Sequence, residues 1–258
     1  MTDTVTIPLA TLLAAARGLA GAARWEQATG LLDAASPGDP RIALAAADIA
    51  VEAGWFTGIE DGPARLSEVD EHGLDAEGRW DLEFTWLRYE YRAAMRRRKD
   101  SAVRQRAERL AATAPDATRL GWAHMYLGLI CDNVFSERAD APPHYAIALA
   151  NSDADPLLRR EAQRHLGDHA HDRGDHEDAL ARWRDATEAG ARAGLVAGTL
   201  SQQMLLAVLA RDAGDEAGAV ALAAEIERWA LAIGATRTAA QATAFRRGVD
   251  PTQPPPQE

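Results

Sequence analysis

The sequence is short of the residues on which several protein classes depend. It has a single lysine, Lys99, and a single cysteine, Cys131, among 258 residues. One thiol cannot form an internal disulfide or a cysteine-based metal site, so we expect a reducing compartment, the cytoplasm. No uncharged apolar stretch reaches the roughly 18 residues of a membrane span, and the start of the chain lacks the basic region of a secretory signal. The sequence therefore predicts a cytoplasmic protein with no membrane partner.

Basic residues are outnumbered by acidic ones, which disfavours nucleic acid as a partner. The 28 arginines and lysines stand against 39 aspartates and glutamates, for a formal net charge of -11. Nucleic-acid binding depends on basic side chains that neutralise phosphates, so a chain of this charge repels the phosphate backbone. The basic run at 96–99 is interpreted as a solvated helix end, where cations favour the negative end of the dipole. We therefore expect no nucleic-acid partner.

Aromatic residues are also few, at 6%, whereas alanine dominates the apolar residues. Alanine is the best helix former and lets helix backbones approach closely. Asp39-Pro40 and Asp155-Pro156 each read as an N-cap followed by proline at the first helical position. Glycines such as Gly54 and Gly174 fall where helices are expected to stop. With apolar residues at helical spacing between these signals, the chain predicts about ten to twelve helices and no sheet.

One unit of this pattern has a definite spacing. Leu166-Gly167 is followed by a turn at Gly174-Asp175, and then by Ala179, Trp183 and Ala186. The small residues let the paired helices touch, and the large one fills the space between neighbouring pairs. This unit resembles the tetratricopeptide repeat (TPR) pattern, and looser copies cover most of residues 8–246. The region 155–234 is also similar to helical-repeat regions of actinobacterial regulators, although no DNA-binding segment accompanies it here.

The resemblance implies an all-α fold, a right-handed α-α superhelix (solenoid) of about five to six TPR-like helix pairs. It would form one domain at residues 1–248, followed by a disordered Pro-rich tail at 249–258. The segment 54–73 is the least regular and is either a helix pair or a loop. The helix at 195–213 is apolar nearly all round, so it must be covered by the final helix, by a partner or by a second copy.

In TPR arrays the first helix of each pair lines a concave groove, where protein or peptide partners bind. Carrying this over by position, we expect polar contacts from Arg164, Asp168 and His171. The apolar contacts are expected from side chains that suit an adaptable surface, namely Met125, Leu129 and Met204. The resemblance therefore implies a non-catalytic binding module that acts in assembly or regulation. A sensor that takes a small molecule or signalling peptide in the same groove is the alternative.

Catalytic or cofactor chemistry has little support in the sequence. His165 and His169 lie one helical turn apart, and such a pair can chelate zinc or nickel with carboxylates completing the site. A solvated polar face is the competing interpretation and is favoured here. Cys131 is interpreted as a small core residue. We find no nucleophile elbow or dinucleotide fingerprint, so neither an enzyme, a cofactor nor a metal is predicted.

Overall fold

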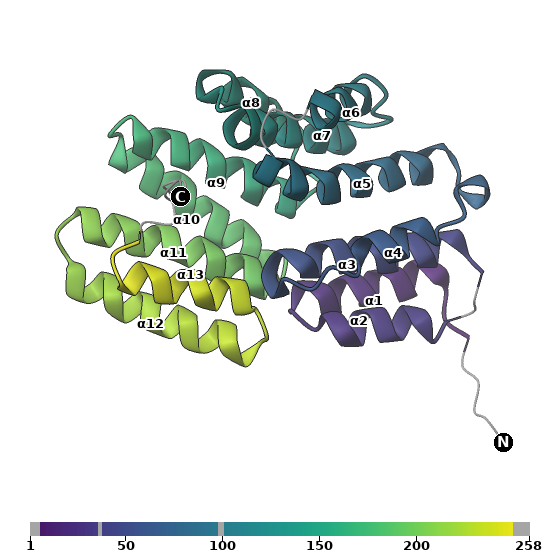
Figure 1. Cartoon of the computed structure of the whole chain (residues 1–258), viewed down its shortest axis with the longest axis horizontal. Coiled ribbons are helices and arrows are strands. Elements are labelled where there is room, and N and C mark those ends of the chain that lie inside the picture. The colour runs from purple at the N-terminus through teal and green to yellow at the C-terminus, as the bar shows by residue number, and fades with distance from the viewer. Residues whose placement is uncertain (1–5, 36–37, 98–100, 250–258) are drawn as a thin grey trace.

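The computed structural model describes residues 6–35, 38–97 and 101–249, and most of them lie in helices (Figure 1). These residues contain no strand, which confirms the all-α fold class. The side chains of the basic run 96–99, and all of the expected tail at 249–258 except Val249, lie outside the described residues. The helices are α1 (Leu9–Gly21), α2 (Trp25–Asp33), α3 (Pro40–Thr57), α4 (Gly62–Ser67), α5 (Ala76–Arg97), α6 (Ser101–Ala112), α7 (Ala117–Ile130), α8 (Ala141–Ala150), α9 (Pro156–Asp172), α10 (His176–Arg192), α11 (Val196–Asp212), α12 (Glu216–Ala232) and α13 (Thr236–Arg246).

Local chemistry sets most of the helix boundaries. The Asp39 side chain accepts a hydrogen bond from the backbone N–H of Arg41 at the start of α3. Asp155 does the same for two backbone N–H groups at the start of α9. Such caps satisfy donors that have no partner within the helix. At the other end of α9, Gly174 has a φ of 76°, which favours glycine. Both expected caps and this stop are confirmed.

The expected stop at Gly54 is wrong, because α3 continues through it to Thr57. The helix ends instead at Gly58, whose φ is 80°. A helix of six residues, α4, and a single 3-10 turn, η1 (Glu71–Gly73), then lead to α5. The irregular segment 54–73 is therefore the end of α3 followed by a much shortened second helix.

Consecutive helices pack on each other, and glycines mark two of the tightest contacts. A Cβ added to Gly167 of α9 would overlap the Trp183 indole of α10. A Cβ added to Gly128 of α7 would lie 2.5 Å from a ring carbon of Tyr145 on α8. Trp183 and Tyr145 are both fully buried. In both helix pairs a glycine thus faces a large residue of the second helix. Trp183 was expected to fill the space between neighbouring pairs, and it packs instead on Gly167 of its own pair.

The two ends of the chain meet. Helices α1–α4 lie beside α11–α13 (Figure 1), and α13 contacts α3 directly. The Thr236 hydroxyl at the start of α13 donates to the Thr57 carbonyl at the end of α3, at 3.0 Å. One core cluster contains Ala16 and Trp25 from the N-terminal helices together with Ala197 and Ala239 from the C-terminal ones. The helices therefore close into one body through a seam between α1–α3 and α11–α13.

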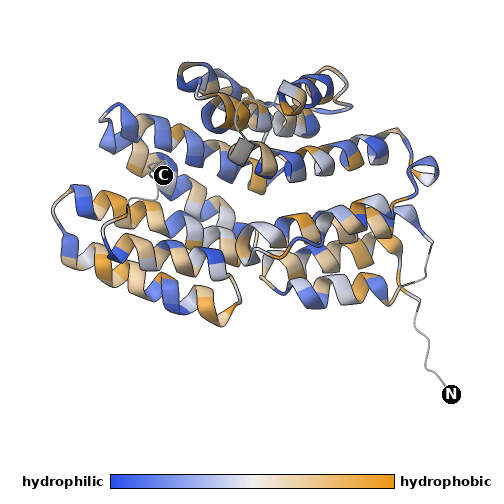
Figure 2. Cartoon of the chain, viewed as in Figure 1, coloured by the Kyte–Doolittle hydropathy of each residue, from blue (hydrophilic) through white to orange (hydrophobic). Residues whose placement is uncertain are grey.

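The apolar helix at 195–213 is covered within the chain. Helix α11 contacts α10, α12 and α13, and Met204 and Val208 share a core cluster with Phe245 of α13. The final helix, a partner and a second copy were the three possible coverings of α11, and the structure shows the final helix, α13, packed on it. Figure 2 shows many hydrophobic residues on α11 and α12, whereas α9 is largely hydrophilic. Within the described ranges no helix has the length and apolar character needed to cross a membrane.

Candidate functional site

Charged side chains from α3, α5 and α9 face one another in the interior of the molecule. Arg88 of α5 pairs with Asp48 of α3, and its Nη2 lies 4.0 Å from Oε2 of Glu52. Burial raises the pKa of Glu52, and Arg88 opposes that rise. The charge of Glu161 on α9 adds to it. The Glu52 side chain is 24% exposed and the Asp48 side chain 36%, so solvent still reaches both carboxylates.

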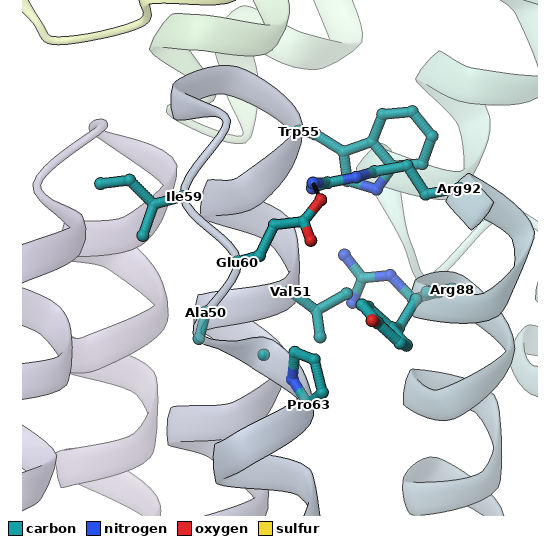
Figure 3. A pocket seen from close by; sticks show the side chains of 10 residues that line it. Ala50, Val51, Trp55, Ile59, Glu60, Pro63, Arg88 and Arg92 are labelled. Atoms are coloured by element: carbon teal, nitrogen blue, oxygen red, sulfur yellow. Dashed lines mark hydrogen bonds and ion pairs between the residues drawn. The ribbon is translucent and has the colours of Figure 1, made fainter. Parts of the chain in front are cut away.

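A second arginine of α5, one turn beyond Arg88, lines a small pocket beside the α3–α4 loop (Figure 3). Arg92 is buried and its Nη2 lies 2.5 Å from Oε1 of Glu60. A Cβ on Gly54 would lie 2.6 Å from Nη1 of Arg92. The glycine inside α3 therefore leaves the space that the guanidinium occupies. In Figure 3, Arg88, Arg92 and Trp55 surround the small pocket that Glu60 closes from the loop.

On α9, Arg160 is buried, and the charges of Arg160 and Glu161 both act on the pKa of Glu52. Nη2 of Arg160 donates to the Gly198 carbonyl of α11 at 2.7 Å, and Arg160 pairs with Glu161. A Cβ on Gly190 or Gly198 would come within 3.1 or 3.2 Å of the Arg160 side chain. Burial lowers the pKa of Arg160, against the effect of Glu161. Its Nε is buried and has no partner within the described part of the chain.

Arg164 lies one turn further along α9 and is only half-buried. Its Nη1 donates to the Ser201 hydroxyl of α11 at 3.2 Å. In the ranges that the structure describes, Arg164 makes no ion pair with a carboxylate at 4.0 Å or less. Its charge contributes to the lowered pKa of Arg160, so the two guanidinium groups lie near each other. We call Asp48, Glu52, Arg88, Arg160, Glu161 and Arg164 the central charged cluster.

The other two polar residues predicted from the sequence lie further along α9. Oδ1 of Asp168 accepts from Nε1 of Trp183 at 3.1 Å. Burial raises the Asp168 pKa to about 6, although Arg164 lowers it. His171 lies in the last turn of α9, and its Nε2 is 2.7 Å from Oδ2 of Asp212. The three residues therefore occupy three different settings, and only Arg164 belongs to the central charged cluster.

The predicted apolar contacts lie in the protein core. Met125 is fully buried in a cluster with Tyr145, and Met204 is 2% exposed. Leu129 is half-buried and packs against the same cluster. Both methionines fill space between helices, so neither offers surface to a ligand in this structure. Cys131 is also buried, as expected for a small core residue, and burial raises the pKa of its thiol.

The His165/His169 pair does not converge on one point. His165 stacks on the Tyr145 ring with 5.1 Å between centroids, and its Nδ1 lies 3.4 Å from Oδ2 of Asp168. His169 instead has Nε2 3.0 Å from Oδ2 of Asp132, which also accepts from the Tyr145 hydroxyl at 2.7 Å. Each imidazole thus has its own carboxylate. The candidate metal ligands that the described residues do bring together are different ones, His171, His176 and Asp212.

Comparison of the chain with family models, with curated proteins and with solved structures finds no match. The function is therefore inferred from the geometry of the chain itself.

Sequence reasoning missed most of the central charged cluster. Asp48 and Glu52 are the only charged residues between Arg41 and Thr57, and they lie one turn apart. A pair of carboxylates on one face of an otherwise apolar helix was a usable signal. The sequence gives no comparable signal for their partner Arg88, because Arg88 comes 40 residues after Asp48 and is one arginine among many. Only the packing of α3 on α5 shows that they meet.

Proposed function

We propose that this chain is a non-catalytic binding module, and that the central charged cluster holds an acidic group of a protein or peptide partner. The proposal is supported above all by Arg164, a half-buried guanidinium that bonds to a hydroxyl instead of a carboxylate. An ionised guanidinium in such a place gains more from an anion than from a neutral hydroxyl. The neighbouring Arg160 adds a second positive charge, and the carboxylate paired with it is that of Glu161.

The architecture proposed for this module is a right-handed superhelix of TPR-like helix pairs. The contacts between consecutive helices and the glycines facing Trp183 and Tyr145 support it. In such an array the first helix of each pair lines the concave side. The charged residues of α3, α5 and α9 would then lie on that side, and a partner segment would reach Arg164 along it.

The test uses two arginines of the same helix. Arg164→Gln removes the proposed anchor, whereas Arg159→Gln changes an exposed arginine of α9 and serves as the matched control. Both proteins and the wild type are titrated with peptides selected by the wild type from a random library. Loss of a charge-assisted hydrogen bond costs about 1.5–3 kcal/mol, so Arg164→Gln should bind about 10- to 100-fold more weakly. Arg159→Gln should bind as the wild type does.

The chemistry of the ligand is tested with the same peptides after amidation of their carboxylates. Amidated peptides should lose affinity for the wild type and show little further loss with Arg164→Gln. Equal affinity of the wild type and Arg164→Gln for the acidic peptides would refute the role of Arg164. Binding of small carboxylic acids by the wild type, with no peptide selected from the library, would instead support the sensor named as the alternative.

A further inference from the structure

A second cluster of polar side chains lies about two helical turns beyond Arg164. His171 is in the last turn of α9, His176 is the first residue of α10, and Asp212 is the last residue of α11. Nε2 of His171 lies 2.7 Å from Oδ2 of Asp212. One possible ligand atom of each residue lies within 4.8 Å of the other two. Three helix ends thus bring two imidazoles and one carboxylate to a single point.

The packing around His171 fixes one member of this cluster. Its side chain is only 12% exposed, and its ring centroid lies 5.6 Å from that of Trp183. Its Nδ1 lies 4.0 Å from Oδ1 of Asp172. His176 and Asp212 are exposed, so both can adjust their rotamers at little cost. The cluster therefore combines one held imidazole with two adjustable ligands.

We propose that His171, His176 and Asp212 bind one divalent transition-metal ion, with zinc the best fit. Imidazole nitrogen with one carboxylate oxygen suits zinc, whereas magnesium prefers oxygen ligands alone. Zinc bonds of about 2.0–2.1 Å in a tetrahedral site place ligand atoms about 3.3 Å apart, so rotation of the two exposed side chains is enough to close the site. Water would occupy the fourth position.

Two further carboxylates adjoin the cluster. Asp172 follows His171 and pairs with Arg138, and Asp175 caps α10 directly before His176. A bound ion would cross-link the ends of α9, α10 and α11. Because an ion that binds only the folded chain stabilises it by mass action, the site would act as a metal-dependent clamp on these helices.

The proposal is tested by calorimetric titration with zinc chloride and, separately, with magnesium chloride. The wild type should bind one zinc ion and no magnesium. His176→Ala and Asp212→Asn each remove one exposed ligand, and each should weaken zinc binding by about tenfold or more. His72→Ala removes an exposed histidine of η1, outside the cluster, and should bind zinc as the wild type does. Arg164→Gln should also leave zinc binding unchanged, which separates this site from the proposed function.

A thermal unfolding series gives a second readout. Zinc should raise the midpoint of the wild type and of His72→Ala, and it should not raise that of His176→Ala. Absence of saturable zinc binding by the wild type would overturn the proposal, as would wild-type affinity in His176→Ala. Loss of binding in His144→Ala alone would place the ion at another pair, His124 and His144, whose Nδ1 atoms are 2.9 Å apart, and would overturn it too.

Discussion

At the residue scale, His165 and Asp168 lie close together on α9 and burial moves their pKa values in opposite directions. Burial lowers the His165 pKa to about 3, and Arg164 lowers it further. Burial raises the Asp168 pKa to about 6, against the effect of Arg164. Near pH 5 the unfolded chain carries a proton on His165, whereas the folded chain carries one on Asp168. The folded and unfolded chains therefore carry nearly the same number of protons on His165 and Asp168 together. The contributions of the two residues to pH-dependent stability offset each other.

Each single variant should expose the contribution of the residue that remains. In Asp168→Asn, only the depressed pKa of His165 is left. Its contribution to stability is present above the unfolded value of 6.5 and is lost as the pH falls towards 3. Asp168→Asn should therefore lose about 2 kcal/mol of unfolding free energy, relative to the wild type, between pH 7 and pH 4.5.

His165→Gln should change in the opposite direction over the same range. The raised pKa of Asp168 makes its contribution fully present below 3.8 and lost as the pH rises through about 6. His165→Gln should therefore gain stability relative to the wild type on acidification, also by about 2 kcal/mol. Urea unfolding at the two pH values measures both variants. Parallel pH profiles for the wild type and both variants would show that the pair does not titrate as described.

At the scale of secondary-structure elements, the close approach of α9 and α10 depends on Gly167. The glycine lies against Trp183, whose Nε1 also donates to the Arg164 carbonyl at 2.9 Å. A methyl group at this position has no free space, so the indole or the helix must move. At Gly30 of α2, by contrast, an added Cβ would have no neighbour within 4 Å, so this glycine only lowers the stability of its helix.

Two glycine-to-alanine changes should therefore have opposite effects on stability. Gly167→Ala should destabilise the protein by about 1–3 kcal/mol, because overpacking outweighs the gain in helix propensity. Gly30→Ala should stabilise it by about 0.5–1 kcal/mol, because alanine is the better helix former. Urea unfolding of the two variants beside the wild type measures both effects. A stabilising Gly167→Ala would contradict the tight packing of α9 on α10.

The sequence could predict features that depend on neighbours in the chain, but not those that depend on how distant helices pack. The cap at Asp155 and the stop at Gly174 depend on neighbours in the chain, so both were predicted correctly. The spacing predicted a small residue at Gly167, but it placed Trp183 between neighbouring helix pairs, whereas Trp183 packs on Gly167 of its own pair. Met125 and Met204 were expected on a binding surface, but their burial depends on helices that pack from other parts of the chain. The pairing of Asp48 with Arg88 depends on such packing as well, and it was not predicted.

At the scale of the whole molecule, the seam between α1–α3 and α11–α13 couples the two ends of the chain. The Thr57–Thr236 hydrogen bond joins residues 179 positions apart. Within the seam, Gly21 of α1 is close enough to α11 that an added Cβ would lie 3.5 Å from a methyl group of Leu195. In an open array each helix pair contacts only its neighbours, so damage at one end stays local. Here the first and last helices should lose or keep their structure together.

Hydrogen exchange can test this coupling with two changes in α1. Ala20→Glu places a charge at a position that is 4% exposed in the shared core cluster, whereas Ala15→Glu places it on the exposed face. A buried, unpaired carboxylate is strongly unfavourable. Ala20→Glu should therefore reduce amide protection in α11–α13 as well as in α1–α3, and Ala15→Glu should leave both unchanged. Loss of protection confined to α1–α3 would mean that the seam contributes little.

The seam also limits how this protein can evolve. Open repeat arrays commonly lengthen or shorten by duplication or deletion of a unit, because each unit needs only its two neighbours. An additional helix pair between α4 and α11 would move α1–α3 away from α11–α13 and expose the alanines that they share. Changes in length should therefore be confined to loops and termini. In this protein, the number of helix pairs is a condition of folding that natural variants cannot easily alter.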